Sequence, residues 1–110
     1  MSNMKPGIES LDYELPGANA PGSFAPILVG VVGSGNLEVL LETLPGPGCR
    51  FHVETSARGF GAIWEAVITD FHRRHPLAGV QVSIHDMGAT PAVVGLRLAQ
   101  AAAELPKGTP

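Results

Sequence analysis

Four stretches of the chain carry the apolar pattern of β-strands. Residues 24–32 are almost continuously apolar and rich in β-branched side chains, which predicts a strand covered on both faces. A second strand is predicted at 37–44. Apolar and polar residues alternate at 50–56 and at 80–86, which predicts two half-buried strands. The Pro-Gly-Pro-Gly run at 45–48 cannot continue a strand, so it predicts a tight turn with antiparallel strands on either side.

Two helices are predicted from apolar residues at helical spacing. The stripe of the first consists of Phe60, Ile63, Trp64, Val67, Ile68 and Phe71. The second opens at Thr90-Pro91, with Thr as N-cap and Pro at the first helical position. Its apolar stripe is Val94, Leu98, Ala101, Ala102 and Leu105, and its polar side is Arg97, Gln100 and Glu104.

The element order is strand, strand, strand, helix, strand, helix (β-β-β-α-β-α). It predicts an α+β fold, a two-layer sandwich in which a mixed sheet of four or five strands carries both helices on one face. Residues 1–22 are rich in Gly, Pro, Ala and Asn, and are interpreted as a loose leader in which residues 11–15 have the pattern of a short edge strand. Residues 23–105 then form a single domain, and 106–110 a disordered tail.

Composition narrows the class of protein. With 110 residues, 45% of them hydrophobic and 15% charged, the chain has room for one globular domain with a modest core. The net charge of −3 argues against a nucleic-acid partner. The apolar run 25–32 is too short to cross a membrane, and the N-terminus lacks the features of a signal peptide. Cys49 is the only cysteine, so a reducing cytoplasmic location fits best.

Ser34 is the main candidate for chemistry. It stands between Gly33 and Gly35 and is followed by Asn36, in a short break between two predicted strands. Glycines without side chains leave such a serine exposed and open to another protein's active site. The alternative is an ordinary hairpin turn in which the serine only contacts solvent.

The residues around Ser34 do not match the sequence patterns of a catalytic serine or of a nucleotide-binding loop. A strand rather than a helix follows residues 30–35, so neither a nucleophile elbow nor a dinucleotide-binding loop is predicted. His85 and Asp86 are adjacent in a strand and point to opposite faces, so they form no relay with Ser34.

Metal and thiol chemistry are not indicated either. His72 and His75 share one helix face, but Arg73 and Arg74 between them would repel a cation. Basic residues at a helix C-terminus favour a structural role. Cys49 has no basic partner placed near it, so it is interpreted as structural.

Two segments together resemble the acyl carrier (delta) subunit of bacterial malonate decarboxylase. They are Val-Val-Gly-Ser-Gly-Asn-Leu-Glu-Val-Leu at 31–40 and Ile-His-Asp-Met-Gly-Ala-Thr-Pro-Ala-Val-Val at 84–94, which continues to Arg97. The resemblance covers residues 27–104 and includes three positions around the first helix: Gly59, Phe60 and Trp64. A more distant similarity is to the acyl carrier (gamma) subunit of citrate lyase, and an unmodified protein-interaction module of this fold is a further alternative.

The resemblance implies a non-catalytic carrier. Ser34 matches the serine that is joined through a phosphodiester to phosphoribosyl-dephospho-CoA, and Gly33, Gly35 and Asn36 complete its attachment loop. The family usually has Asp where this chain has Asn36. The implied partners are the acyl transferase and decarboxylase subunits, and the phosphoribosyl-dephospho-CoA transferase that attaches the group. The implied cargo is acetyl or malonyl, held as a thioester.

The predicted connections also place Ser34 in the fold. The strands at 24–32, 50–56 and 80–86 should run in the same direction and end at one edge of the sheet. That edge would hold Ser34 and the N-termini of both helices, which attract phosphate. We expect it to be the docking face for the prosthetic arm and the transferase, with Arg58 contributing charge.

Overall fold

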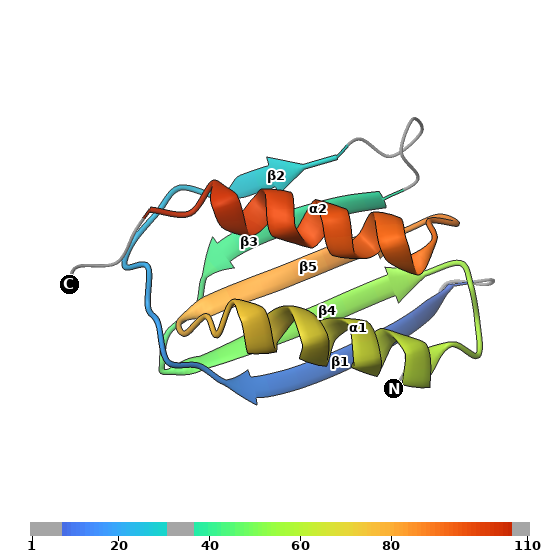
Figure 1. Ribbon diagram of the computed structural model, residues 1–110, viewed down its shortest axis with the longest axis horizontal. Helices are drawn as coiled ribbons and strands as arrows, with labels where there is room; N and C mark the ends of the chain where they lie inside the picture. Colours follow the sequence, from blue (N-terminus) through green and yellow to red (C-terminus); the bar gives the residue numbers. More distant parts are fainter. Residues whose placement is uncertain (1–7, 31–36, 107–110) are drawn as a thin grey trace.

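The described residues form a single five-stranded sheet with two helices on one of its faces, as predicted (Figure 1). It is seen in a computed structural model that describes residues 8–30 and 37–106. The elements in chain order are β1 (Glu9–Pro16), β2 (Ile27–Val29), β3 (Leu37–Thr43), β4 (Gly48–Thr55), α1 (Gly61–Arg74), β5 (Val80–Asp86) and α2 (Pro91–Ala103). The strand order is β1-β4-β5-β3-β2, and only β4 and β5 are parallel neighbours.

The predicted antiparallel direction of the strands on either side of the 45–48 turn is confirmed, and β5 lies between them. The chain reverses between β3 and β4 as expected, but these two strands are not hydrogen-bonded neighbours, because β5 lies between them. Ile84 of β5 is paired with Val39 of β3 on one side and with Val53 of β4 on the other. After α1, the chain therefore forms a strand that lies between the two preceding strands, β3 and β4.

The two outer strands differ from the pattern-based prediction. The pattern at 24–32 predicts a strand covered on both faces, but within the described ranges β2 has three residues and pairs with β3 alone. Leu28 is 59% exposed, because both helices lie on the other face. At the opposite edge, the expected strand 11–15 is part of the longer β1, which pairs along its whole length with β4.

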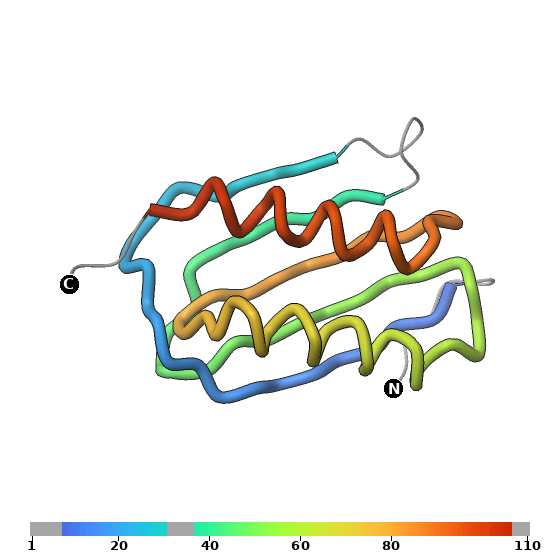
Figure 2. The backbone as a smooth tube through the Cα atoms, viewed as in Figure 1, coloured from blue at the N-terminus to red at the C-terminus, as the bar shows by residue number. Residues whose placement is uncertain are grey.

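Both helices run across one face of the sheet (Figure 2), and the buried side chains of the core lie between the two layers. Alternate strand residues face it, and in β4 Phe51 packs edge-to-face on Phe71 of α1 with ring centroids 6.1 Å apart. From α2, Val94, Leu98 and Ala101 are buried, as their spacing predicted. This packing fixes both helices on the sheet.

The two helix starts are built differently. Thr90 caps α2 as predicted, since its hydroxyl accepts a 3.4 Å hydrogen bond from the Val93 N–H, and Pro91 is the first helical residue. At α1 the N-cap residue Phe60 makes no side-chain capping bond. Phe60 and Ile63 are both 46% exposed, so the predicted apolar stripe of this helix is only partly a core stripe.

Candidate functional site

The end of β2 and the start of β3, which flank the Ser34 segment in sequence, lie at the same edge of the sheet as the ends of β4 and β5. Leu37, the first residue of β3, is level with Asp86 at the end of β5, and Thr55 at the end of β4 is level with the same residue. Gly30 directly follows β2, which is antiparallel to β3. Both helices begin at this edge (Figure 1). The chain therefore leaves and re-enters the sheet at the edge expected for Ser34.

The attachment loop itself remains a prediction. Ser34, Gly33, Gly35 and Asn36 all lie outside the described residues. The common direction of β2, β4 and β5 is confirmed by the strand pairing.

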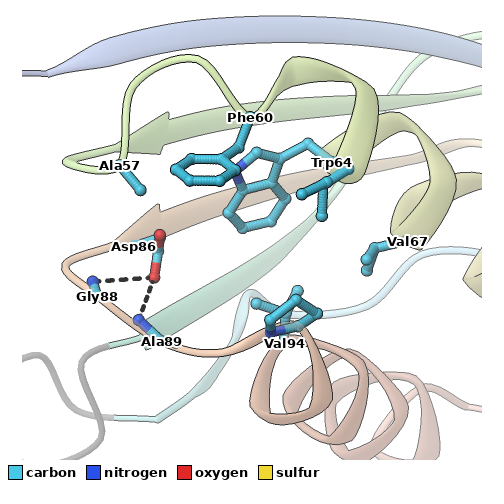
Figure 3. Close-up of a pocket in the computed structure, with 10 residues that line it drawn as sticks. Ala57, Phe60, Trp64, Val67, Asp86, Gly88, Ala89 and Val94 are labelled. Atoms are coloured by element: carbon cyan, nitrogen blue, oxygen red, sulfur yellow. Dashed lines mark hydrogen bonds between the residues drawn. The ribbon is translucent and has the colours of Figure 1, made fainter.

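Asp86 fastens the joint between β5 and α2. Its side chain is almost fully buried, and one carboxylate oxygen accepts a 2.8 Å hydrogen bond from the hydroxyl of Thr55. The other oxygen accepts bonds from the backbone N–H groups of Gly88, at 3.2 Å, and Ala89, at 2.7 Å (Figure 3). Gly88 has φ = 116°, a value that side chains disfavour, so glycine is needed at this turn.

An apolar cavity of about 270 Å³ opens beside this joint, between the first turns of α1 and α2. The rings of Phe60 and Trp64 lie on one side of it and Val94 on the other (Figure 3). Both oxygens of Asp86 already accept hydrogen bonds from the protein. The cavity therefore offers mainly apolar contact, and Trp64 forms part of its wall besides being a core residue.

The position of Arg97 was not predicted from the sequence. The helical pattern placed it on the polar side of the second helix, but in the structure its Nε is buried and has no hydrogen-bond partner within the described part of the chain. Its Nη1 donates a 3.0 Å bond to Gln100. A Cβ atom on Gly30 would stand 3.5 Å from the Arg97 Nε. The guanidinium thus lies where the chain leaves β2 toward Ser34.

The sequence contained a weak sign of this position. Arg97 is three residues after Val94 and directly before Leu98, both buried against the sheet, so it flanks the buried side of α2. The helical pattern alone could not place the end of β2 next to it.

Arg58 lies in the loop between β4 and α1 and is exposed. It forms no ion pair with any of the residues that the structure describes. The same loop is fastened to β1, because the N–H of Gly59 donates a 3.0 Å hydrogen bond to Glu9. Arg58 is therefore at the predicted edge, with its charge available to a partner.

The side chains of His72 and Cys49 are both buried. His72 is buried, with its Nε2 3.0 Å from the carbonyl oxygen of Leu77. Within residues 8–30 and 37–106, no group of three or more His, Cys, Asp and Glu side chains could hold a metal ion. Cys49 is buried and unpaired, and burial raises the pKa of its thiol to about 12. Among the described helices, none is both long and apolar enough to cross a membrane.

The fold and the site define a small α+β protein with an apolar cavity and a partly buried guanidinium at one end of its sheet. A family model described as "Malonate decarboxylase delta subunit (MdcD)" matches residues 25–105. The chain belongs to this family, and it is an acyl carrier subunit rather than a catalytic one.

Individual relatives agree with this assignment. The chain is 67% identical over 106 residues to the malonate decarboxylase acyl carrier protein of Burkholderia cepacia, covering 96% of this chain and 98% of the relative. It is 55% identical over 96 residues to that of Xanthomonas euvesicatoria pv. vesicatoria, covering 86% and 91%. A chain in the crystal structure of a Pseudomonas malonate decarboxylase hetero-tetramer in complex with malonate is 38% identical, with a TM-score of 0.78 and coverage of 87% and 97%.

Proposed function

We propose that this protein carries acetyl and malonyl groups on phosphoribosyl-dephospho-CoA, joined to Ser34 by a phosphodiester, for the decarboxylation of malonate to acetate and carbon dioxide. The group supplies a thiol that holds the acyl unit as a thioester, whose neutral carbonyl can accept the negative charge left when carbon dioxide departs. The protein's own part is to hold the group and to present it to other subunits.

Arg97 is the observation that carries this proposal. Its buried Nε–H has no acceptor among residues 8–30 and 37–106, and a buried N–H left without one is unfavourable by about 1–3 kcal/mol, so its position needs a reason. It lies beside Gly30, four residues before Ser34. A phosphodiester on Ser34 would bring an anionic acceptor to this part of the molecule, and arginine pairs well with phosphate oxygens.

The helix starts support the same chemistry. Neither helix has an acidic residue in its first turn, and α1 has no side-chain cap. The free N–H groups of the first turn of α1, and the partial positive charge at both helix starts, make this edge favourable for phosphates. The residues that would hold the arm are therefore Arg97 and the backbone of the first turn of α1, with Arg58 adding charge for the incoming donor.

Tethering explains why a separate carrier is useful. A covalently attached thiol stays at high local concentration as it passes from an acyl transferase subunit to a decarboxylase subunit. We expect these two subunits, and the phosphoribosyl-dephospho-CoA transferase, to approach the edge where Phe60 and Ile63 are exposed. Their apolar side chains and the neighbouring cavity are suited to a partner's surface. We place this cycle in the cytoplasm, consistent with the single unpaired Cys49.

The mass of the intact protein tests the proposal. Protein purified from its native host should be heavier than the bare chain by the mass of one phosphoribosyl-dephospho-CoA unit linked through a phosphodiester. A bare chain isolated from cells that are degrading malonate would contradict the proposal and favour the unmodified interaction module. The family assignment already favours the malonate decarboxylase carrier over the citrate lyase carrier.

A further inference from the structure

The face of the sheet that both helices leave open is strongly acidic. Strand residues that alternate with the core positions point to this face, and five of them are carboxylates: Asp12, Glu14, Glu38, Glu42 and Glu54. Arg50 is the one Lys or Arg among the strand residues on this side. The whole chain has ten acidic residues and a net charge of −3. Half of its carboxylates thus lie on one surface.

Five side chains on this face form a continuous row across four strands. His52 contacts Asp12 with its Nδ1, at 2.7 Å, and Glu54 with its Nε2, at 3.3 Å. The other oxygen of Glu54 lies 3.7 Å from the Nε2 of His85, whose Nδ1 lies 3.8 Å from Glu38. We refer to these five residues as the acid–histidine row. The row alternates carboxylate and imidazole and ends in a carboxylate on both sides.

Among the residues that the structure describes, the negative charge of this surface is only partly balanced. Arg50 is already 3.6 Å from Glu14, outside the row. Within the described ranges, the basic side chains next to the three carboxylates of the row are its two histidines, and when these are neutral the row carries three negative charges. Concentrated like charge opposes folding through mutual repulsion. A basic partner surface would remove this repulsion.

An apolar contact point completes the surface. Leu28, 59% exposed, is paired across β2 and β3 with Leu40, which lies on the same face between Glu38 and Glu42. Protein interfaces commonly combine apolar contacts with charged groups that orient the partner. The face thus has both a charge to attract a partner and an apolar site to hold it.

We propose that this open sheet face docks a basic surface of another subunit of the malonate decarboxylase complex. The inference rests on the proposed function only in its choice of partner, and it concerns the face away from the core, not the edge where the arm would be attached. Docking through this face would leave the edge near Ser34 free to present the acyl group.

The test uses the purified carrier and the remaining subunits of its own complex, prepared without carrier. Glu38→Gln/Glu54→Gln removes two charges from the row and keeps the side-chain shapes. Glu65→Gln/Glu104→Gln, at an exposed position of α1 and at the exposed C-cap of α2, makes the same change in net charge elsewhere. Binding is measured at about 0.05 M and about 0.5 M salt, because screening weakens surface attraction. Unfolding curves check that both variants are folded.

We expect the row variant to bind about tenfold more weakly at low salt, a difference that shrinks at high salt, and the control to bind like the parent protein. Equal weakening by both variants would mean that only net charge matters, and no weakening by the row variant would mean that the face is not used. Either result would overturn the proposal.

Ser83→Lys puts a cation between His52 and Leu40 and should weaken binding, whereas Ser83→Gln should not. This pair provides a second test that does not depend on the row variant. Arm attachment to Ser34 is measured separately by mass. Attachment without docking through this face would contradict this proposal alone, whereas a lack of attachment would contradict the proposed function.

Discussion

The Thr55 hydroxyl donates a 2.8 Å hydrogen bond to the buried carboxylate of Asp86, joining the ends of two parallel strands. Because the same carboxylate holds two N–H groups of the following turn, it sets where α2 begins. The cavity and Arg97 both depend on that helix. A single buried acid therefore positions much of the proposed carrier site.

Replacing Asp86 should lower the stability of the folded protein. Asp86→Ala leaves the Thr55 hydroxyl and two turn N–H groups without their acceptor, and we expect the free energy of unfolding to fall by about 2–3 kcal/mol. Thr55→Val should cost about 1–2 kcal/mol. Urea unfolding measures both. Glu65→Ala, at an exposed position of α1, is the control and should change stability by less than about 0.5 kcal/mol. An effect of Asp86→Ala no larger than the control would contradict this account of the joint.

His52 should titrate above the usual histidine range. Partial burial lowers its pKa, but hydrogen bonds to Asp12 and Glu54 and the charges of these carboxylates outweigh burial and raise it above 6.5. A raised pKa contributes stability that is fully present below about 6.5 and is lost as pH rises through the folded-state value. The side chain is 30% exposed, so the contribution should stay under about 1 kcal/mol.

NMR titration of the imidazole checks this prediction. The His52 pKa should lie above 6.5 in the parent protein and fall in Asp12→Asn. An unchanged pKa in Asp12→Asn would contradict the role assigned to the contact.

Cys49 should be unreactive in the folded protein. Its thiol is buried and its pKa of about 12 leaves almost no thiolate at neutral pH. A thiol-specific chromogenic disulfide should therefore react far more slowly with the native protein than with protein in denaturant. Comparable rates in the two states would show that the thiol is accessible and that the interpretation of Cys49 as structural is wrong.

Arg97 should assist arm attachment through its charge and its Nε. Arg97→Gln should lower the rate of transfer of the arm about tenfold. Arg97→Lys keeps the charge but not the Nε, so its transfer rate should lie between those of the parent protein and Arg97→Gln. Arg73→Gln is the control, because Arg73 is at the far end of α1 and paired with Asp70. The phosphorus NMR signal of the attached phosphodiester should also shift in Arg97→Gln, which a loss of general stability would not cause. Normal transfer and an unmoved signal would exclude Arg97 from the site.

Local patterns predicted the elements of the fold but not all of their neighbours. The helix spacing, the Thr90 cap and the common direction of three strands follow from residues close together in sequence. The insertion of β5 between β3 and β4 depends on long-range pairing, for which the turn at 45–48 gives no signal. For the same reason Leu28 was expected to be covered and Arg97 to face solvent. Both depend on β2 being an edge strand next to α2.

The most direct test of the central claim locates the prosthetic group on the chain. The protein would be co-expressed with its phosphoribosyl-dephospho-CoA transferase, digested and sequenced by tandem mass spectrometry, beside a Ser34→Ala variant treated identically. We predict the added mass on Ser34 in the parent protein and no addition in the variant. The group on another Ser or Thr, with Ser34 bare, would contradict the account.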